Sequence, residues 1–245
     1  MFPISVSVPT RFAPIATYGL IAANVVVFIL LISLPPFAQE AVAYQYGLVP
    51  ARYGDPQWAL GVGLAPTNVL PFVTSLFLHG GWFHLIFNMW TLWLFGPAIE
   101  DRVGSIKYLA FYVGCGIAAG AAQAIVDLDS TIPLVGASGA IAGVLGAYVR
   151  QFPLSKVVVL VPIIFIPYFF DLPALLYIAL WFLAQVVQGL GSLGAMEAGG
   201  IAWWAHIGGF VAGALAAPFL CCSPRVYRRY YNDEGVFGYR PHGGR

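Results

Sequence analysis

A serine and a histidine stand in apolar stretches of this chain, where polar side chains are costly and therefore informative. Ser138 lies in the run Gly136-Ala137-Ser138-Gly139, and His206 follows Ala205 and precedes Ile207. A serine hydroxyl is a weak nucleophile until a base takes its proton, and an imidazole is a suitable base. If folding brings the two side chains together, the pair predicts nucleophilic catalysis.

Two more polar side chains share one helical face. His84 and Asn88 are four residues apart, so both point to the same side of a helix. Together with the backbone N–H of Ser138, at the start of a predicted helix, they would donate to negative charge developing on a substrate oxygen. Two other notable polar residues inside predicted spans are His79, which is interpreted as structural, and Gln185. No Asp or Glu joins them, which favours a Ser-His dyad over a triad.

The composition indicates that lipid surrounds most of the chain. Of the 245 residues, 60% are hydrophobic and 9% are charged, and the mean hydropathy is +0.83. Soluble domains carry about 25% charged residues. The net charge of +1, without a large basic block, argues against nucleic acid as a partner. We therefore expect an integral membrane protein whose partner is the lipid bilayer.

Apolar, charge-free stretches locate the helices that must position these side chains. A spanning helix needs about 20 apolar residues. The predicted spans are 14–34, 71–95, 107–126, 136–150, 172–191 and 202–222. We expect an all-α fold, with a six-helix membrane domain over 1–222 and a cytoplasmic tail over 223–245. The stretch 157–170 is apolar but short and contains two prolines, which is typical of an interfacial or re-entrant segment.

The basic residues predict the orientation. With six spans, ten of the eleven Lys and Arg residues fall on the side that holds both termini, and only Arg52 falls outside. The positive-inside rule then places both termini in the cytoplasm. At about 1.5 Å per residue, Asn88 and Ser138 lie roughly 18 Å, and His206 roughly 24 Å, from the cytoplasmic ends of their helices. All three are predicted in the outer half of the membrane.

Small residues indicate which helices touch. Two stripes recur every four residues: Gly139, Gly143 and Ala147 in the fourth span, and Ala205, Gly209, Gly213 and Ala217 in the sixth. Such stripes let helix backbones approach closely in lipid. We expect the two stripes to face each other and to bring the serine within hydrogen-bond reach of the histidine.

These motifs resemble those of the rhomboid intramembrane proteases. The family shows a Gly-x-Ser-Gly motif, here 136–139, and a His-x-x-x-Asn motif on the second core span, here 84–88. It shows a histidine among small residues on the last core helix, here 205–209, and a turn resembling Glu100-Asp101-Arg102-Val103-Gly104. The resemblance covers about residues 14–222, with the three site motifs in the expected order.

The resemblance implies a role for each site residue. Ser138 would be the nucleophile and His206 the general base, and His84, Asn88 and the Ser138 N–H would form the oxyanion site. The implied reaction is hydrolysis of peptide bonds in single-span membrane proteins near their outer ends, without a cofactor or metal. The implied location is a bacterial inner membrane with both termini cytoplasmic; the sequence sets no oligomeric state.

One position departs from the family pattern. Some relatives have a tyrosine four residues after the serine, stacked on the histidine, where this chain has Ala142. The aromatic residues that could brace His206 instead are Trp203, Trp204 and Phe210.

Two other functions are less consistent with these residues. A non-catalytic relative that binds membrane clients usually lacks the serine or the histidine, and this chain keeps both. A proton-relaying transporter would be expected to show carboxylates inside the spans. A metal site from His79, His84 and His206 is disfavoured, because no acidic or Cys ligand joins them.

Overall fold

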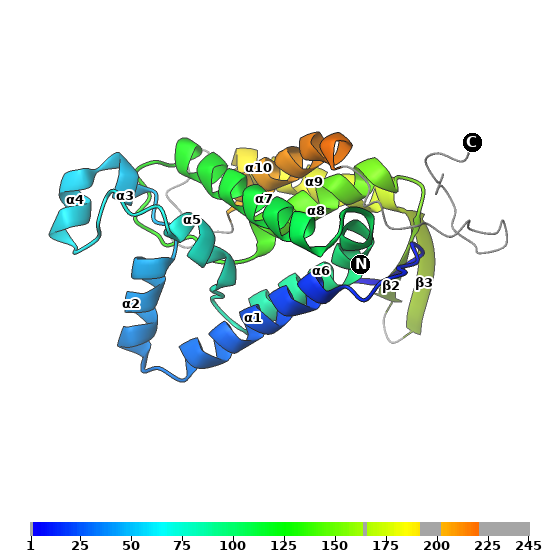
Figure 1. Ribbon diagram of the computed structural model, residues 1–245, viewed down its shortest axis with the longest axis horizontal. Helices are drawn as coiled ribbons and strands as arrows, with labels where there is room; N and C mark the ends of the chain where they lie inside the picture. Colours follow the sequence, from blue (N-terminus) through cyan, green and yellow to red (C-terminus); the bar gives the residue numbers. More distant parts are fainter. Residues whose placement is uncertain (1, 164–165, 192–201, 221–245) are drawn as a thin grey trace.

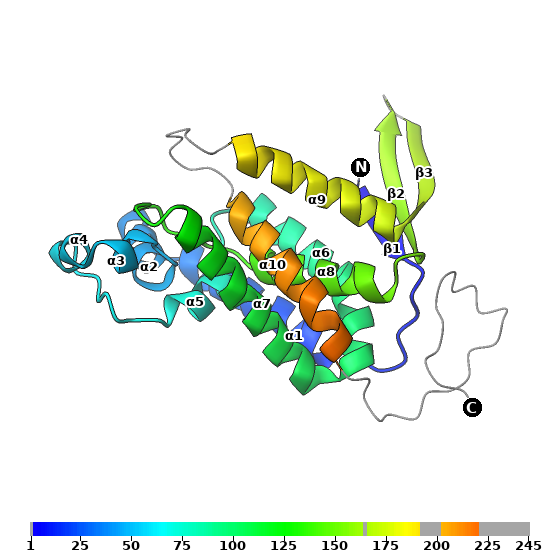
Figure 2. The ribbon, with the colours of Figure 1, turned by 90° about the horizontal axis from the view of Figure 1, so that it is seen from above.

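The computed structural model describes residues 2–163, 166–191 and 202–220. Within these ranges, six long helices lie close to the predicted spans and form one bundle, as Figures 1 and 2 show. They are α1 (Ile15–Ile32), α6 (Trp82–Val103), α7 (Ser105–Val126), α8 (Ser138–Gln151), α9 (Ala174–Gly191) and α10 (Trp203–Ala216).

The six helices differ in length and apolarity. In the described part of the chain, three of them, α1, α7 and α9, are long and apolar enough to cross a membrane. Helices α8 and α10 have 14 residues each, so each is about 21 Å long, whereas the hydrocarbon core of a bilayer is about 30 Å thick. The two helices that carry Ser138 and His206 are therefore shorter than that core is thick.

The second predicted span begins later than expected. Helix α6 begins at Trp82, and the preceding residues form α5 (Pro71–Thr74), η1 (Ser75–Phe77) and a turn that contains Gly80 and Gly81. Two adjacent glycines favour a turn over a helix, because they lose the most conformational freedom in a helix. His79 therefore lies in the turn before the helix rather than inside the span.

The connection between α1 and α5 is largely helical. It contains α2 (Pro36–Tyr46), α3 (Ala51–Gly54) and α4 (Pro56–Gly61). Arg52, which is fully buried, donates from Nη2 to the carbonyl oxygens of Tyr44 (2.8 Å) and Gln45 (3.1 Å). A cation here neutralises the carbonyl end of α2, because the last carbonyls of a helix lack partners in the helix itself.

The stretch predicted as interfacial or re-entrant forms a β-hairpin. Strands β2 (Lys156–Ile163) and β3 (Ile166–Pro173) pair antiparallel, and β1 (Phe2–Val6) pairs antiparallel with β2, in the order β1-β2-β3. Pro162 and Pro167 are opposite each other near the tip, and the β-branched run before them favours strand over helix. The all-α prediction is therefore too narrow, since a mostly helical fold carries this small sheet.

Carboxylates at the end of α6 hold the start of α1. Glu100, 2% exposed, accepts from the backbone N–H groups of Ala16 (2.8 Å) and Thr17 (2.7 Å), and from the hydroxyls of Thr17 (2.7 Å) and Ser105 (2.6 Å). The first N–H groups of a helix have no partner in the helix and attract negative charge. Glu100 thus acts as a cap supplied by another helix, which gives the 100–104 motif a structural role.

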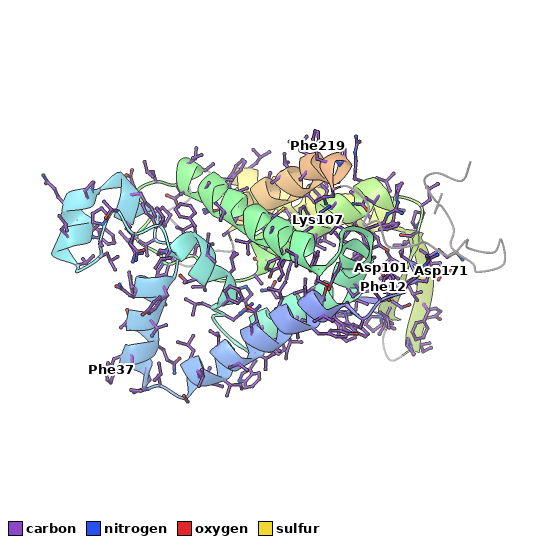
Figure 3. All side chains as sticks on the ribbon, in the orientation of Figure 1. Phe12, Phe37, Asp101, Lys107, Asp171 and Phe219 are labelled. Atoms are coloured by element: carbon purple, nitrogen blue, oxygen red, sulfur yellow. The ribbon has the colours of Figure 1, made fainter. Side chains whose placement is uncertain are left out.

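The connecting segments gather at the two ends of the bundle. At one end, Arg11 and Phe12 donate backbone N–H groups to Asp101 Oδ1 (3.2 and 3.0 Å), and Figure 3 shows Phe12 and Asp101 together. The sheet lies at the same end (Figure 2). Elsewhere, Leu48 and Leu134 exchange two backbone hydrogen bonds of 3.0 and 2.8 Å, which join the segment after α1 to the segment after α7.

The sixth helix is shorter than the predicted span. Helix α10 ends at Ala216 and continues as η2 (Ala217–Phe219), which contains Pro218. A proline lacks the N–H that a helix interior needs, which accounts for the change. The end of the predicted span at 221–222 and the predicted tail, 223–245, lie outside the described residues.

Candidate active site

Helices α8 and α10 pack backbone against backbone along the two small-residue stripes. A Cβ atom on Gly209 would overlap the carbonyl oxygen of Gly139, and one on Gly213 would overlap that of Gly143. One turn further along α8, a Cβ atom on Gly146 would overlap the carbonyl oxygen of Phe210. Only glycine permits this separation, so the stripes determine how closely the two helices approach.

This close packing brings Ser138 to His206. Ser138 is the first residue of α8, and His206 lies in the first turn of α10. Ser138 Oγ is 2.8 Å from His206 Nε2, a normal hydrogen-bond distance, although the two residues are 68 positions apart in the sequence. His206 is 9% exposed, so little water competes for its ring. The arrangement places the serine hydroxyl within hydrogen-bond distance of an imidazole nitrogen.

The other ring nitrogen of His206 also has a partner. Nδ1 is 2.6 Å from Gln185 Oε1 on α9. The rings of Trp181 and Trp203 lie 6.1 and 6.2 Å from the His206 ring, measured between centroids. Trp203 was one of the aromatic candidates, whereas Trp181 was missed. The sequence places Gln185 in a predicted span and assigns it no role. The feature that could have pointed to a role is an amide within an apolar span, because such a group needs a hydrogen-bond partner.

The turn before Ser138 is shaped by Gly136. Its φ of +128° is a conformation that residues with a side chain rarely adopt, and its N–H donates to the carbonyl oxygen of Ser75 (2.9 Å). A Cβ atom here would stand 2.7 Å from Nε2 and Cε1 of His84. Glycine at 136 therefore both permits the turn and leaves space for the His84 ring beside the serine.

The proposed oxyanion donors gather around the same turn. Asn88 Nδ2 would be 3.7 Å from a Cβ on Gly136, and it is buried with no hydrogen-bond partner among the described residues. The N–H of Ser138 is in the first turn of α8, where helix geometry supplies no acceptor. The His84 ring and Asn88 Nδ2 thus lie around Gly136, two residues before Ser138. His79 packs edge-on against His84, with ring centroids 5.0 Å apart.

A small cavity of about 20 Å³ adjoins the serine. Its lining includes Ser75, Gly116, Gly136, Ser138 and Ala205. A cavity needs about 10–15 Å³ to accommodate one water molecule. Its size and its partly polar lining suit water beside the nucleophile, as a hydrolytic reaction requires.

Comparisons with known proteins identify a family for this chain. The family model described as the rhomboid domain matches residues 66–223. The chain is 33% identical over 115 residues to the putative rhomboid protease YdcA of Bacillus subtilis, covering 45% of this chain and 57% of that protein. It is 30% identical over 153 residues to the mitochondrial rhomboid protein 1 of Saccharomyces cerevisiae, covering 61% of this chain and 41% of that protein.

A third relative matches a shorter stretch more closely. The rhomboid protease GluP of Bacillus subtilis is 43% identical over 75 residues, covering 31% of this chain and 14% of that protein. The chain thus spans 57% or less of the length of these three relatives. The matched domain and the apolar helices lead to one conclusion: this chain is an integral membrane protein that belongs to the rhomboid family.

Proposed function

We propose that this protein is an intramembrane serine endopeptidase that cleaves single-span membrane proteins near the outer face of the membrane. The observation that carries the proposal is the 2.8 Å contact between Ser138 Oγ and His206 Nε2. The family relatives that are named proteases support the same reaction class. Ser138 acts as nucleophile and His206 as general base.

The geometry suggests a complete acyl-transfer cycle. Ser138 Oγ attacks the substrate carbonyl carbon while its proton passes to His206 Nε2. The carbonyl oxygen becomes an oxyanion that accepts hydrogen bonds from the Ser138 N–H, Asn88 Nδ2 and His84. His206 then gives its proton to the departing amine, which leaves an ester on Ser138. Water attacks that ester, His206 takes the water's proton, and the acid product leaves as Ser138 regains its hydrogen.

The proposed membrane arrangement has six spans over residues 1–222, a tail over 223–245, and both termini in the cytoplasm. The segments before α1, after α6 and after α8 meet at one end of the bundle, which supports an even number of crossings between them. The basic residues favour that end as the cytoplasmic one. We propose the inner (plasma) membrane of a bacterium as the location, and two of the relatives are bacterial proteins, from Bacillus subtilis.

Topology reporters test the arrangement. Fusions after residues 34, 128 and 245 should report the outer side at 34 and 128 and the cytoplasm at 245, because two spans separate position 34 from position 128 and three more separate position 128 from the tail. Two reporters that are active on opposite sides of the membrane, such as alkaline phosphatase and a fluorescent protein, supply the measurement. A signal from the outer side at 245 would contradict the six-span arrangement.

Covalent labelling tests the catalytic role. A mechanism-based serine reagent, such as a fluorophosphonate, should attach to Ser138 in the full-length protein, because His206 removes the hydroxyl proton during attack. Labelling, followed by mass spectrometry of the modified peptide, should fall to background in Ser138→Ala and in His206→Ala.

The matched control is Ser33→Ala. Ser33 is exposed at the end of α1, and its hydroxyl donates to the carbonyl oxygen of Leu30 (2.6 Å), so labelling should be unchanged. A folded protein whose Ser138 stays unlabelled would instead indicate a non-catalytic protein that binds membrane clients.

A further inference from the structure

Gln185 is an amide buried on a helix that is otherwise anchored by apolar residues. The buried residues of α9 are Ala174, Ile178, Gln185 and Gly189. Gln185 is 6% exposed, and burying an amide in an apolar setting is costly unless its hydrogen-bonding groups are paired. Both ends of this amide have partners, and one of them is the histidine of the proposed dyad.

The two partners determine which way the amide faces. Gln185 Nε2 lies 3.4 Å from the carbonyl oxygen of Trp181, which can only accept a hydrogen bond. The amide oxygen therefore faces His206, with 2.6 Å between Oε1 and Nδ1. An amide oxygen can only accept as well, so Nδ1 must carry the hydrogen in this contact.

The position of that hydrogen determines what the other ring nitrogen does. A neutral imidazole carries one hydrogen, so with Nδ1 protonated the lone pair is on Nε2. Nε2 is the atom 2.8 Å from Ser138 Oγ, and it is then ready to accept the serine proton. The opposite tautomer would direct an N–H at the hydroxyl and could not act as a base.

We propose that Gln185 is the positioning residue of the dyad: its amide oxygen holds His206 in the tautomer and ring orientation that let Nε2 take the proton of Ser138. The inference rests on the proposed catalytic roles of Ser138 and His206. Trp181 and Trp203, whose rings lie near the imidazole, restrict its position further. Ala142, on α8, contributes no aromatic ring to the packing of His206. The hydrogen bond from Gln185 on α9 is the polar contact that holds Nδ1 of the imidazole.

The positioning role and a purely structural role predict different kinetics. During proton transfer His206 becomes a cation, and a hydrogen bond to a charged group is stronger than one to a neutral group. Loss of the acceptor should therefore raise the barrier more than it destabilises the resting protein. A structural tether between α9 and α10 would instead lower the melting temperature and leave the turnover of the folded fraction unchanged.

Three variants separate these roles. Gln185→Met keeps the length of the side chain but removes the amide, and it should lower kcat about 10- to 100-fold with little change in KM or melting temperature. Gln185→Glu keeps an acceptor oxygen in either ionisation state and should recover most of the activity. Gln188→Leu is the matched control: Gln188 is an exposed amide on the same helix, bonded to the carbonyl oxygen of Ala184 (3.0 Å), so kcat should not change.

A spectroscopic measurement tests the positioning without relying on activity. The ¹⁵N chemical shifts of His-labelled full-length protein distinguish the two imidazole tautomers, and His206→Gln identifies the signals of His206 among the four histidines of the chain. The expected result is the Nδ1–H tautomer in the wild type and in Ser138→Ala, and a mixture of tautomers in Gln185→Met.

The outcomes separate this inference from the proposed function. An Nε2–H tautomer in the wild type, or full kcat in Gln185→Met, would overturn the role of Gln185 even in an active protease. An Nδ1–H tautomer that depends on Gln185, in a protein that cleaves nothing, would leave the positioning intact and refute the protease.

Discussion

Ser138→Ala is expected to abolish cleavage of a single-span membrane substrate, lowering kcat about 10⁴-fold or more, the scale seen when a serine nucleophile is deleted. The reason is that Oγ is the atom that forms the covalent bond, and among the described residues no other hydroxyl is hydrogen-bonded to His206 Nε2. The measurement is the initial rate of cleavage with purified full-length protein in lipid, followed by gel or by a fluorescent reporter.

The same variant should remain folded. The substitution removes one hydrogen bond, which typically contributes about 1 kcal/mol to stability, and it leaves the bond between His206 and Gln185 in place. Its melting temperature should therefore lie within a few degrees of the wild type, as should that of Ser33→Ala, which should also keep full activity. Cleavage by Ser138→Ala at the wild-type rate would rule out the proposed mechanism.

Asn88→Leu is expected to lower kcat about 10²- to 10³-fold, the usual cost of removing one oxyanion donor. Asn88 Nδ2 is buried without a partner among the described residues, so in the resting protein it has no hydrogen bond to lose. Leucine has the same number of side-chain heavy atoms and the same branching, and it does not bury an unpaired donor, which normally costs about 1–3 kcal/mol. The substitution should therefore leave the melting temperature unchanged or raise it while turnover falls.

This opposite movement of stability and turnover makes the test specific. A structural Asn88 would predict a lower melting temperature, and a residue that only binds substrate would predict a higher KM at constant kcat. Thr91→Val is the matched control, because Thr91 is a half-buried polar residue on the same helix and its hydroxyl donates to the carbonyl oxygen of Phe87 (2.8 Å). Thr91→Val should alter neither the melting temperature nor the turnover. A higher KM at constant kcat in Asn88→Leu would assign Asn88 to substrate binding.

Several features of the fold could be predicted from the sequence because they depend on local patterns. Long apolar runs located the six helices to within a few residues at most ends, since lipid requires backbone groups to bond within their own helix. The glycine stripes predicted the contact between α8 and α10, because a repeat of four residues marks one helical face wherever it occurs. The Ser138–His206 contact followed from those two local patterns and the order of the spans.

Other features depended on residues far apart in the sequence. The run 157–163 became a strand because it pairs with residues 2–6 and 166–173, and a short apolar run does not reveal such partners. The role of Glu100 as a cap for α1 joins residues 84 positions apart, and the sequence shows only a charged motif.

Within the site, the partner of His206 Nδ1 also depends on residues far apart in the sequence. The sequence identified Gln185 as a polar residue in an apolar span, but its rotation about the helix axis and its depth relative to α10 depend on how three helices pack. Tertiary structure decided that Oε1 faces Nδ1 and that Trp181, rather than Trp204 or Phe210, lies near the ring. Residue type and spacing thus determined which groups could do chemistry, while packing between distant helices decided how they are oriented, because hydrogen-bond geometry is sensitive to shifts smaller than one helical turn.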